Sequence, residues 1–264
     1  MNTQTLLHQV VNICHDAGLA ILQVYGTEFT VDQKADQSPL TEADRRAHDV
    51  IVAGLASLDS KIPVLSEESP PEIMAERLAW RRYWLVDPLD GTKEFVKRNG
   101  EFTVNIALIE DHRAVLGAVH APVLGVDYFG ALQSGAWTCH AGQAQEPIQV
   151  HSPARKIPVV VGSRSHRGQS LDRMLQRLGQ HELVAMGSSL KICLVATGEA
   201  DFYPRLGPTS EWDTAAAQAV LESAGGYMVD THGNPLRYNK ADILNPHFLA
   251  FADDAVDWLG LGHD

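Results

Sequence analysis

The sequence predicts an α/β protein in which amphipathic helices are layered against β-sheets. The chain opens with a long segment whose apolar residues recur at helical spacing, and its middle contains short β-rich runs separated by turns. Its last third alternates strand-like and helix-like segments, which indicates an α/β unit. With 264 residues, of which 45% are hydrophobic and 20% charged, the chain can form one large or two modest globular domains.

The first half is predicted to contain two helices followed by a sheet. The first helix starts near Leu6 and ends near Gly26, and the second starts at Thr41. The second helix should bury Ala47, Val50, Ile51, Leu55 and Leu58. Two short strands, Ile62–Leu65 and Tyr83–Val86, come next. An antiparallel meander is then predicted at Thr103–Ile109, Ala114–His120, Val126–Ala131 and Ala136–Cys139.

The pattern changes after the polar stretch 141–153. Strands are predicted at Pro158–Val161, Leu183–Met186, Phe202–Tyr203, Tyr227–Val229 and Phe248–Phe251. Helices are predicted at Leu171–Leu178, Leu190–Thr197 and Thr214–Ala224. We therefore expect an N-terminal α+β domain of residues 1–145 and a C-terminal α/β domain of residues 146–264.

Composition narrows the class of partner. A formal net charge of −12 argues against a nucleic-acid polymer, because phosphate backbones are held by basic surfaces, but it leaves small phosphorylated ligands open. Cys14, Cys139 and Cys193 are odd in number and widely spaced, which is typical of reduced thiols in the cytoplasm. We expect no signal peptide and no membrane-spanning segment.

The segment Asp87-Pro88-Leu89-Asp90-Gly91-Thr92 carries the strongest chemical signal. Two carboxylates stand three residues apart directly after an apolar run, which predicts a buried strand that ends in a tight turn at Asp87-Pro88. Carboxylates at the C-terminal end of a strand suit Mg²⁺, a hard cation that prefers oxygen ligands. Gly91 lets the backbone approach an anion, and Thr92 can orient a water. An ordinary Asx-Pro turn is the alternative.

Further acidic residues stand where strands end or helices begin. Glu67 and Glu68 follow a predicted strand, whereas Asp44 and Asp213 precede helical runs. The last two match the pattern [S/T]-x-x-[D/E] of a capping box, so helix capping is their alternative role, and a solvated loop is the alternative for Glu67. If these carboxylates converge, they predict a site for several Mg²⁺ ions that handles phosphate.

Segment 85–95, the pair Glu67-Glu68 and the run Trp212-Asp213-Thr214-Ala215-Ala216 together resemble the inositol monophosphatase superfamily. The resemblance covers essentially the whole chain. It implies a layered αβαβα sandwich of the inositol monophosphatase and fructose-1,6-bisphosphatase type. It also implies a lithium-sensitive phosphomonoesterase that uses two or three Mg²⁺ ions and direct attack by water, without a phosphoenzyme.

The resemblance assigns roles to individual residues. The metal ligands would be Glu67, Asp87, the carbonyl of Leu89, Asp90 and Asp213. Asp44, Thr92 and Glu67 would form the catalytic group that orients and deprotonates the attacking water. Residues in contact with the substrate would include Glu67, Leu89, Asp90, Gly91, Thr92 and Asp213, and the backbone N–H groups of Gly91 and Thr92 would bind the scissile phosphate.

Two loops of the second half are candidate substrate contacts. The turn Gly187-Ser188-Ser189 precedes a helix and offers N–H groups and hydroxyls to an anion, with N-capping by a serine as the alternative. Segment 162–167 gathers basic groups, with a solvated loop as the alternative. Both resemble the nucleotide-contacting regions of bisphosphate nucleotidases. This resemblance implies substrate contacts at Ser165, His166, Gly187, Ser188 and Lys191.

Arg205 bears on the choice of substrate. Inositol monophosphatases carry a Glu near this position that accepts hydrogen bonds from the sugar ring, which a guanidinium cannot do. An arginine suits a second phosphate or a base, so the leading hypothesis is hydrolysis of adenosine 3′,5′-bisphosphate to AMP and phosphate, in support of sulfate assimilation. Hydrolysis of inositol phosphate or another sugar phosphate is the alternative. A catalytically silent metal- or nucleotide-binding protein is a third reading.

The resemblance leaves the assembly open between a monomer and a homodimer. We expect a cytoplasmic protein. Some relatives are peripheral on the cytoplasmic face of the inner membrane, so such an association is a further expectation, although no basic amphipathic stretch supports it.

Overall fold

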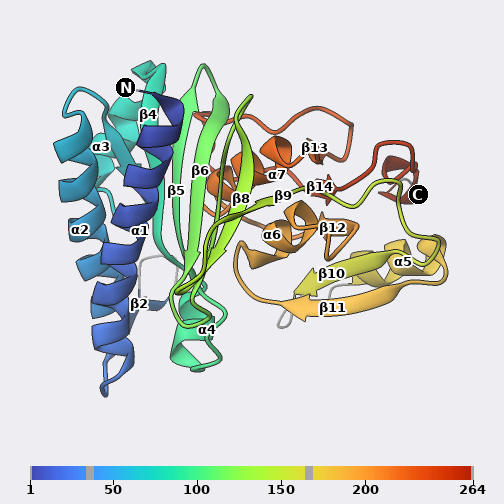
Figure 1. Cartoon of the computed structure of the whole chain (residues 1–264), viewed down its shortest axis with the longest axis horizontal. Coiled ribbons are helices and arrows are strands. Elements are labelled where there is room, and N and C mark those ends of the chain that lie inside the picture. Colours follow the sequence, from blue (N-terminus) through green and yellow to red (C-terminus); the bar gives the residue numbers. More distant parts are fainter. Residues whose placement is uncertain (1, 34–38, 164–168, 263–264) are drawn as a thin grey trace.

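The structure, a computed structural model, describes residues 2–33, 39–163 and 169–262. Figure 1 shows five layers in the order helices, sheet, helices, sheet, helix. Among the described residues, three hydrophobic clusters fill the spaces between these layers: one under the N-terminal helices, one between the two sheets and one beneath the last helical layer. The predicted αβαβα sandwich is confirmed.

Two long helices form the first layer. Helix α1 spans Thr3–Tyr25, begins with the Asn2 side chain accepting a hydrogen bond from the N–H of Gln4, and ends at Gly26. Helix α2 spans Glu42–Leu58 and begins at a capping box on Thr41. The two helices cover one face of the first sheet, where their apolar side chains are buried. Both predicted helices are confirmed.

The first sheet has seven strands in the order β3-β4-β5-β6-β7-β8-β9 among the described residues. They are β3 Val64–Ser66, β4 Arg82–Asp90, β5 Thr103–Glu110, β6 Arg113–Ala121, β7 Val126–Ala131, β8 Gly135–His140 and β9 Glu146–Ile148. Strands β3 and β4 are parallel, and every later neighbour is antiparallel. The predicted meander is confirmed.

The expectation that strand β4 ends at Asp87-Pro88 is wrong. The strand runs on to Asp90, and its register shifts between Asp87, which lies opposite Asn105, and Asp90, which lies opposite Thr103. A proline has no N–H to donate, and such an irregularity is where a strand tolerates one. The turn follows at Gly91, whose φ of 93° few residues other than glycine adopt, and helix α4 (Thr92–Val96) starts there.

Several short elements escape prediction because they are too brief to show a hydrophobic period. They are β1 Val31–Gln33, β2 Pro39–Thr41, α3 Pro71–Glu76, the 3₁₀ turns η1 Arg77–Ala79 and η2 Leu259–Gly262, α4 and β9.

The second sheet has five strands in the order β11-β10-β12-β14-β13 within the described ranges. They are β10 Val159–Ser163, β11 Glu182–Met186, β12 Phe202–Arg205, β13 Tyr227–Asp230 and β14 Phe248–Phe251. Helices α6 (Leu190–Ala196) and α7 (Ala215–Ser223) lie between the two sheets, and α5 (Gln169–Leu178) covers the far face (Figure 1). The chain passes from the first sheet to the second after β9, and the division into domains at residue 145 stays a prediction.

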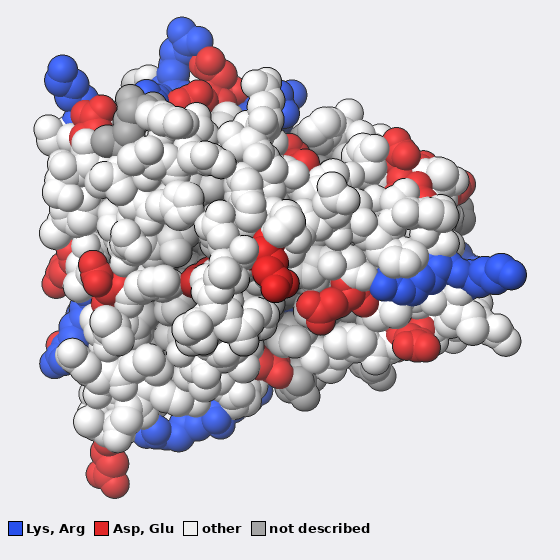
Figure 2. Space-filling view, in the orientation of Figure 1, with Lys and Arg blue, Asp and Glu red and all other residues white. Residues whose placement is uncertain are grey.

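Three further expectations concern the molecule as a whole. The three cysteines are free, as predicted. Within the part of the chain that the structure describes, no helix is long and apolar enough to cross a membrane. On the face shown in Figure 2, Lys and Arg side chains lie in separate groups toward the edges, with Asp and Glu between them. That distribution gives no continuous basic track on this face for a nucleic-acid backbone.

Candidate active site

Two of the predicted metal ligands lie at the C-terminal end of β4. Asp87 is 1% exposed, and its Oδ1 accepts a hydrogen bond from the N–H of Leu89 at 3.0 Å. Asp90 lies beyond the register shift of the same strand. Both residues line a cavity of about 320 Å³ together with Leu89 and Thr92. The local irregularity of β4 therefore brings two carboxylates to one cavity from a single strand.

Two other elements bring Glu67 and Asp213 to the same cavity. Glu67 directly follows β3, and its N–H donates to the carbonyl of Val86, which keeps it beside β4. Asp213 comes from the other half of the chain, in the turn before α7, where its Oδ2 accepts a hydrogen bond from the N–H of Ser210 at 2.9 Å. Carboxylate oxygens of Asp87, Asp90 and Asp213 all lie within 4.8 Å of one another.

The electrostatics of this cluster favour a cation. Burial, reinforced by the neighbouring carboxylates of Asp90 and Glu67, raises the pKa of Asp213 to about 8. Like charges at this separation disfavour each other's ionised form unless a cation neutralises them. The donors are all hard oxygens, which is the set that Mg²⁺ prefers. The residues present therefore fit the metal that the sequence predicts.

Asp44 takes part in two sets of contacts. Its Oδ2 accepts hydrogen bonds from the N–H and the hydroxyl of Thr41, both at 2.7 Å, so the capping role is confirmed. Its Oδ1 lies 3.4 Å from the hydroxyl of Thr92, which also lies 3.3 Å from the carbonyl of Leu89. Asp44 is 2% exposed. Capping and contact with the predicted catalytic threonine are thus compatible in one side chain.

The serine turn of the second half holds Asp90. The Ser188 hydroxyl and the Ser189 N–H each donate to Oδ2 of Asp90 at 2.6 Å. Ser189 stands at the N-cap of α6, but its hydroxyl donates to Asn105 at 2.8 Å and makes no capping bond. The N-capping alternative therefore does not describe these side chains. They join the two halves of the chain at the acidic cluster.

Sequence reasoning missed the residues that complete this junction. The hydroxyl of Thr103 lies 2.7 Å from that of Ser188 and 2.8 Å from that of Ser189. Asn105 follows two residues later on β5. Because β5 is antiparallel to β4, Thr103 and Asn105 pair with Asp90 and Asp87, a register that the sequence does not reveal.

Two basic residues, Lys191 and Arg205, line a cavity together with residues of the acidic cluster, and we call this pair the cationic wall. Gly187, Ser188, Lys191 and Arg205 line a cavity of about 140 Å³ that also includes Asp90, Gly91 and Asp213. Burial lowers the pKa of Lys191 to about 8, although the nearby Asp90 works in the opposite direction. The Lys191 ammonium donates to the carbonyl of Ser188. Positive and negative groups thus line one cavity, which suits an anionic ligand that arrives with cations.

Arg205 lies at the border of two cavities. Its guanidinium donates to the carbonyl of Gly207 at 3.2 Å and to that of Pro208 at 2.6 Å. It lines the 140 Å³ cavity and also an adjacent one of about 350 Å³ beside Tyr203, Leu206 and Pro208. Arg205 is therefore placed between the acidic cluster and a larger, more apolar space.

The predicted contacts Ser165 and His166 lie outside the described residues. Lys93 and Glu94, which sequence reasoning did not single out, line both the cavity of about 140 Å³ and the cavity of about 320 Å³. They belong to the first turn of α4 and directly follow Thr92, so their adjacency to the acidic motif was the available signal.

The model of the inositol monophosphatase family matches residues 2–255. This chain belongs to the inositol monophosphatase family. The family is one of metal-dependent phosphatases, and the acidic cluster described above lies where the family resemblance predicts the metal ligands.

Similar proteins are named as bisphosphate nucleotidases. The chain is 52% identical over 246 residues to the 3′(2′),5′-bisphosphate nucleotidase CysQ of Escherichia coli K12, covering 92% of this chain and 98% of that protein. It is 36% identical to the Haemophilus influenzae protein of the same name over 256 residues, 96% and 95% of the two chains. The crystal structure of CysQ from Bacteroides thetaiotaomicron, described as a bacterial member of this family, aligns with a TM-score of 0.84 at 42% identity, covering 95% and 98% of the chains.

Proposed function

We propose that this chain is a Mg²⁺-dependent phosphomonoesterase that hydrolyses adenosine 3′,5′-bisphosphate to AMP and phosphate. The observation that carries the proposal is the convergence of Asp87, Asp90 and Asp213 beside the cationic wall of Lys191 and Arg205. Relatives that are 52% identical are named 3′(2′),5′-bisphosphate nucleotidases, which supports the same substrate class.

The metal ions would be held by oxygen donors only. Asp87, Asp90 and Asp213, with Glu67 and the carbonyl of Leu89 lining the same cavity, would hold two or three Mg²⁺ ions. When bound, these ions supply positive charge against the phosphate oxygens and lower the pKa of water at the site. The sequence resemblance implies sensitivity to lithium, so lithium would inhibit the activity.

The nucleophile would be a water positioned by Thr92 and Glu67. The Thr92 hydroxyl would accept a hydrogen bond from this water and donate its own proton toward Asp44, which lies 3.4 Å away. Asp44 keeps its carboxylate in place through the hydrogen bonds from Thr41, so it can receive the proton without losing its orientation. The pair thus supplies a base at a fixed position.

The rest of the substrate would be bound by the cationic wall. The N–H groups of Gly91 and Thr92, at the start of α4, would bind the scissile phosphate, and Lys191, which lines the neighbouring cavity, would offset its charge. Arg205 would bind the second phosphate or the base, since it also lines the larger cavity. Phosphoryl transfer leaves the protein mainly positioning and charge stabilisation to provide, and these residues provide both.

The cellular role follows from the substrate. The enzyme would remove adenosine 3′,5′-bisphosphate, a by-product of sulfate assimilation, in the cytoplasm. Peripheral association with the membrane stays a prediction. The choice between a monomer and a homodimer stays open.

The test is phosphate release from adenosine 3′,5′-bisphosphate and from inositol 1-phosphate, each with Mg²⁺ and with chelator. We expect Mg²⁺-dependent release with a strong preference for the nucleotide, and a loss of at least about 10² in Asp90→Asn while the variant stays folded. Preference for inositol phosphate would overturn the substrate assignment and keep the metal chemistry. Near-normal turnover by Asp90→Asn would overturn the metal site itself.

A further inference from the structure

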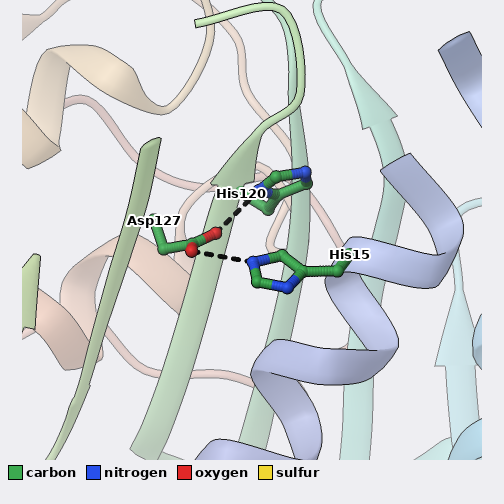
Figure 3. Close-up of side chains that lie close together, drawn as sticks. All are labelled: His15, His120 and Asp127. Carbon is green, nitrogen blue, oxygen red and sulfur yellow. Dashed lines mark hydrogen bonds and ion pairs between the residues drawn. The ribbon is translucent and has the colours of Figure 1, made fainter. Parts of the chain in front are cut away.

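Three side chains meet on the far side of the first sheet from the acidic cluster. His15 comes from α1, His120 from β6 and Asp127 from β7, as Figure 3 shows. Asp127 accepts from both imidazoles: Nε2 of His15 lies 2.7 Å from its Oδ2, and Nδ1 of His120 lies 2.7 Å from its Oδ1. One possible ligand atom from each residue lies within 4.8 Å of the other two.

The sheet separates this cluster from the proposed active site. His120 pairs with Val104 of β5, and Val104 belongs to the core under α1 and α2. Thr103 and Asn105, its neighbours on the same strand, contact Ser189 on the opposite face. The proposed phosphatase chemistry does not use the cluster of His15, His120 and Asp127, which we call the histidine cluster.

The cluster is held in place by its surroundings. His120 and Asp127 face each other directly across two neighbouring strands, and the Thr138 hydroxyl fixes the Asp127 carbonyl from the third strand. Gly18 leaves room for the His120 ring under α1, because a Cβ at that position would lie 2.6 Å from Nε2 and Cδ2 of the imidazole. The imidazole of His120 is 13% exposed and the carboxylate of Asp127 is 9% exposed, so both have few alternative positions.

The cluster of His15, His120 and Asp127 is open to solvent on the side of His15. Its side chain is 44% exposed, whereas the other two are largely buried. An ion could therefore enter beside His15 and retain solvent water as a further ligand. Two imidazole nitrogens and one carboxylate, with a position left for water, form a donor set that Zn²⁺ commonly takes in proteins.

We propose that His15, His120 and Asp127 form a second metal site, which takes Zn²⁺ or a divalent transition ion with the same ligand preference. The ion takes the place of the hydrogen between each coordinating ring nitrogen and the carboxylate. A neutral imidazole then carries its single proton on the other ring nitrogen, and an imidazolium releases its extra proton to solvent. Nitrogen donors favour Zn²⁺ and Co²⁺ over Mg²⁺, so this site and the all-oxygen cluster select different ions. A bound ion fastens α1 to β6 and β7 and stabilises the folded chain by mass action.

Co²⁺ is the probe, because its absorption bands in the visible report nitrogen coordination in a low-symmetry site. Co²⁺ is titrated into the full chain in excess Mg²⁺, which occupies the oxygen site. We expect about one equivalent to develop these bands, Zn²⁺ to abolish them, and His15→Ala to weaken Co²⁺ binding at least about tenfold. The matched control is His8→Ala, which removes another exposed α1 histidine that lies outside the cluster and contacts Gln145.

His15 is half-exposed and outside the proposed active site, so His15→Ala should keep the Mg²⁺-dependent phosphate release of the parent chain, which verifies its fold. A second readout is the rise of Tm with added Zn²⁺, which should be lost in His15→Ala and kept in His8→Ala. Equal Co²⁺ binding by the two variants would overturn the proposal. Absence of the bands in the parent chain would also overturn it and leave the three side chains as a hydrogen-bonded network.

Discussion

The hydroxyl of Thr92 lies within reach of two acceptors, the carboxylate of Asp44 and the carbonyl of Leu89. The hydroxyl has one proton, so it can donate a good hydrogen bond to only one of these acceptors at a time. In the proposed mechanism it donates to Asp44 while its oxygen accepts a hydrogen bond from the attacking water. The proposed role of Thr92 therefore depends on its hydroxyl group and not on the shape of its side chain.

That dependence gives a matched pair of variants. Thr92→Val keeps the shape and removes the hydroxyl, and we expect kcat to fall by about 10² or more, the range of a lost general base. Thr92→Ser keeps the hydroxyl and should retain most of the activity. Steady-state kinetics with Mg²⁺ saturating checks both, and equal rates for the two variants would contradict the role of the hydroxyl.

As a proposed metal ligand, Asp213 would make metal binding depend on pH. In the metal-free protein burial and the carboxylates nearby raise its pKa to about 8, so below that pH a cation must displace a proton to use it. We expect the apparent affinity for Mg²⁺ to weaken by about tenfold for each pH unit below about 8. Mg²⁺ activation curves between pH 6 and 9 measure this change, and an affinity that does not vary with pH would contradict it.

At the scale of elements, the contact of α7 with the first sheet limits which amino acids are tolerated at position 117. Gly117 of β6 lies directly under α7, where a Cβ would stand 2.1 Å from the carbonyl oxygen of Ala216. Backbone at this distance cannot move aside as a flexible side chain would. The helix that begins two residues after Asp213 is therefore positioned by the absence of a side chain at residue 117.

Gly117→Ala should consequently lower the free energy of unfolding by about 1–3 kcal/mol, the usual cost of overpacking. We also expect reduced activity, because α7 would carry Asp213 away from Asp87 and Asp90. Gly26→Ala is the matched control, since its Cβ would meet nothing nearer than 3.6 Å and its φ of −75° suits any residue. Urea unfolding of both variants makes the comparison, and equal stabilities would contradict the close contact.

The proposed metal site would also affect the stability of the whole molecule. The raised pKa of Asp213 means that folding disfavours its ionised form. This destabilisation grows as the pH rises from the ordinary carboxyl pKa to about 8, and it is largest above that value. A bound cation would remove this destabilisation, so the gain in stability on metal binding should be largest above pH about 8.

Asp213→Asn separates these effects, because an amide oxygen can still accept the hydrogen bond from Ser210. In chelator at pH 8 we expect the Tm of this variant to exceed that of the parent chain by about 2–4 °C for each kcal/mol relieved. With saturating Mg²⁺ the order should reverse, since the parent chain gains from binding. Thermal unfolding with and without Mg²⁺ tests both, and a lower Tm of the variant in chelator would contradict the repulsion.

The layers and most of the ligands follow from the sequence because their signals are local. The helical spacing of apolar residues in α1 reflects one buried face, the apolar runs of β5 to β7 reflect strands buried on both faces, and the Asp87-Asp90 pair lies within one strand. The approach of Asp213 to that pair was expected only from the family resemblance. Its physical cause, a turn before α7 held against the first sheet, involves residues far apart in the chain.

What the sequence could not predict depends on register or on tertiary contact. Pro88 indicated the end of a strand, but the register shift beside it let β4 continue. Ser189 matched a helix cap, yet its hydroxyl donates to Asn105, whose position follows from the pairing of β4 with β5. His15 and His120 are 105 positions apart, so no spacing rule could have joined them to Asp127.

The hydrogen bonds from Ser188 and Ser189 to Asp90 have a consequence for biosynthesis. Because the strand that carries Asp90 leaves the ribosome well before the turn that orients it, and Asp213 emerges later still, a nascent or prematurely terminated chain lacks a finished catalytic centre. Such fragments would not hydrolyse nucleotide, and hydrolysis would begin only after Asp213 has been synthesised.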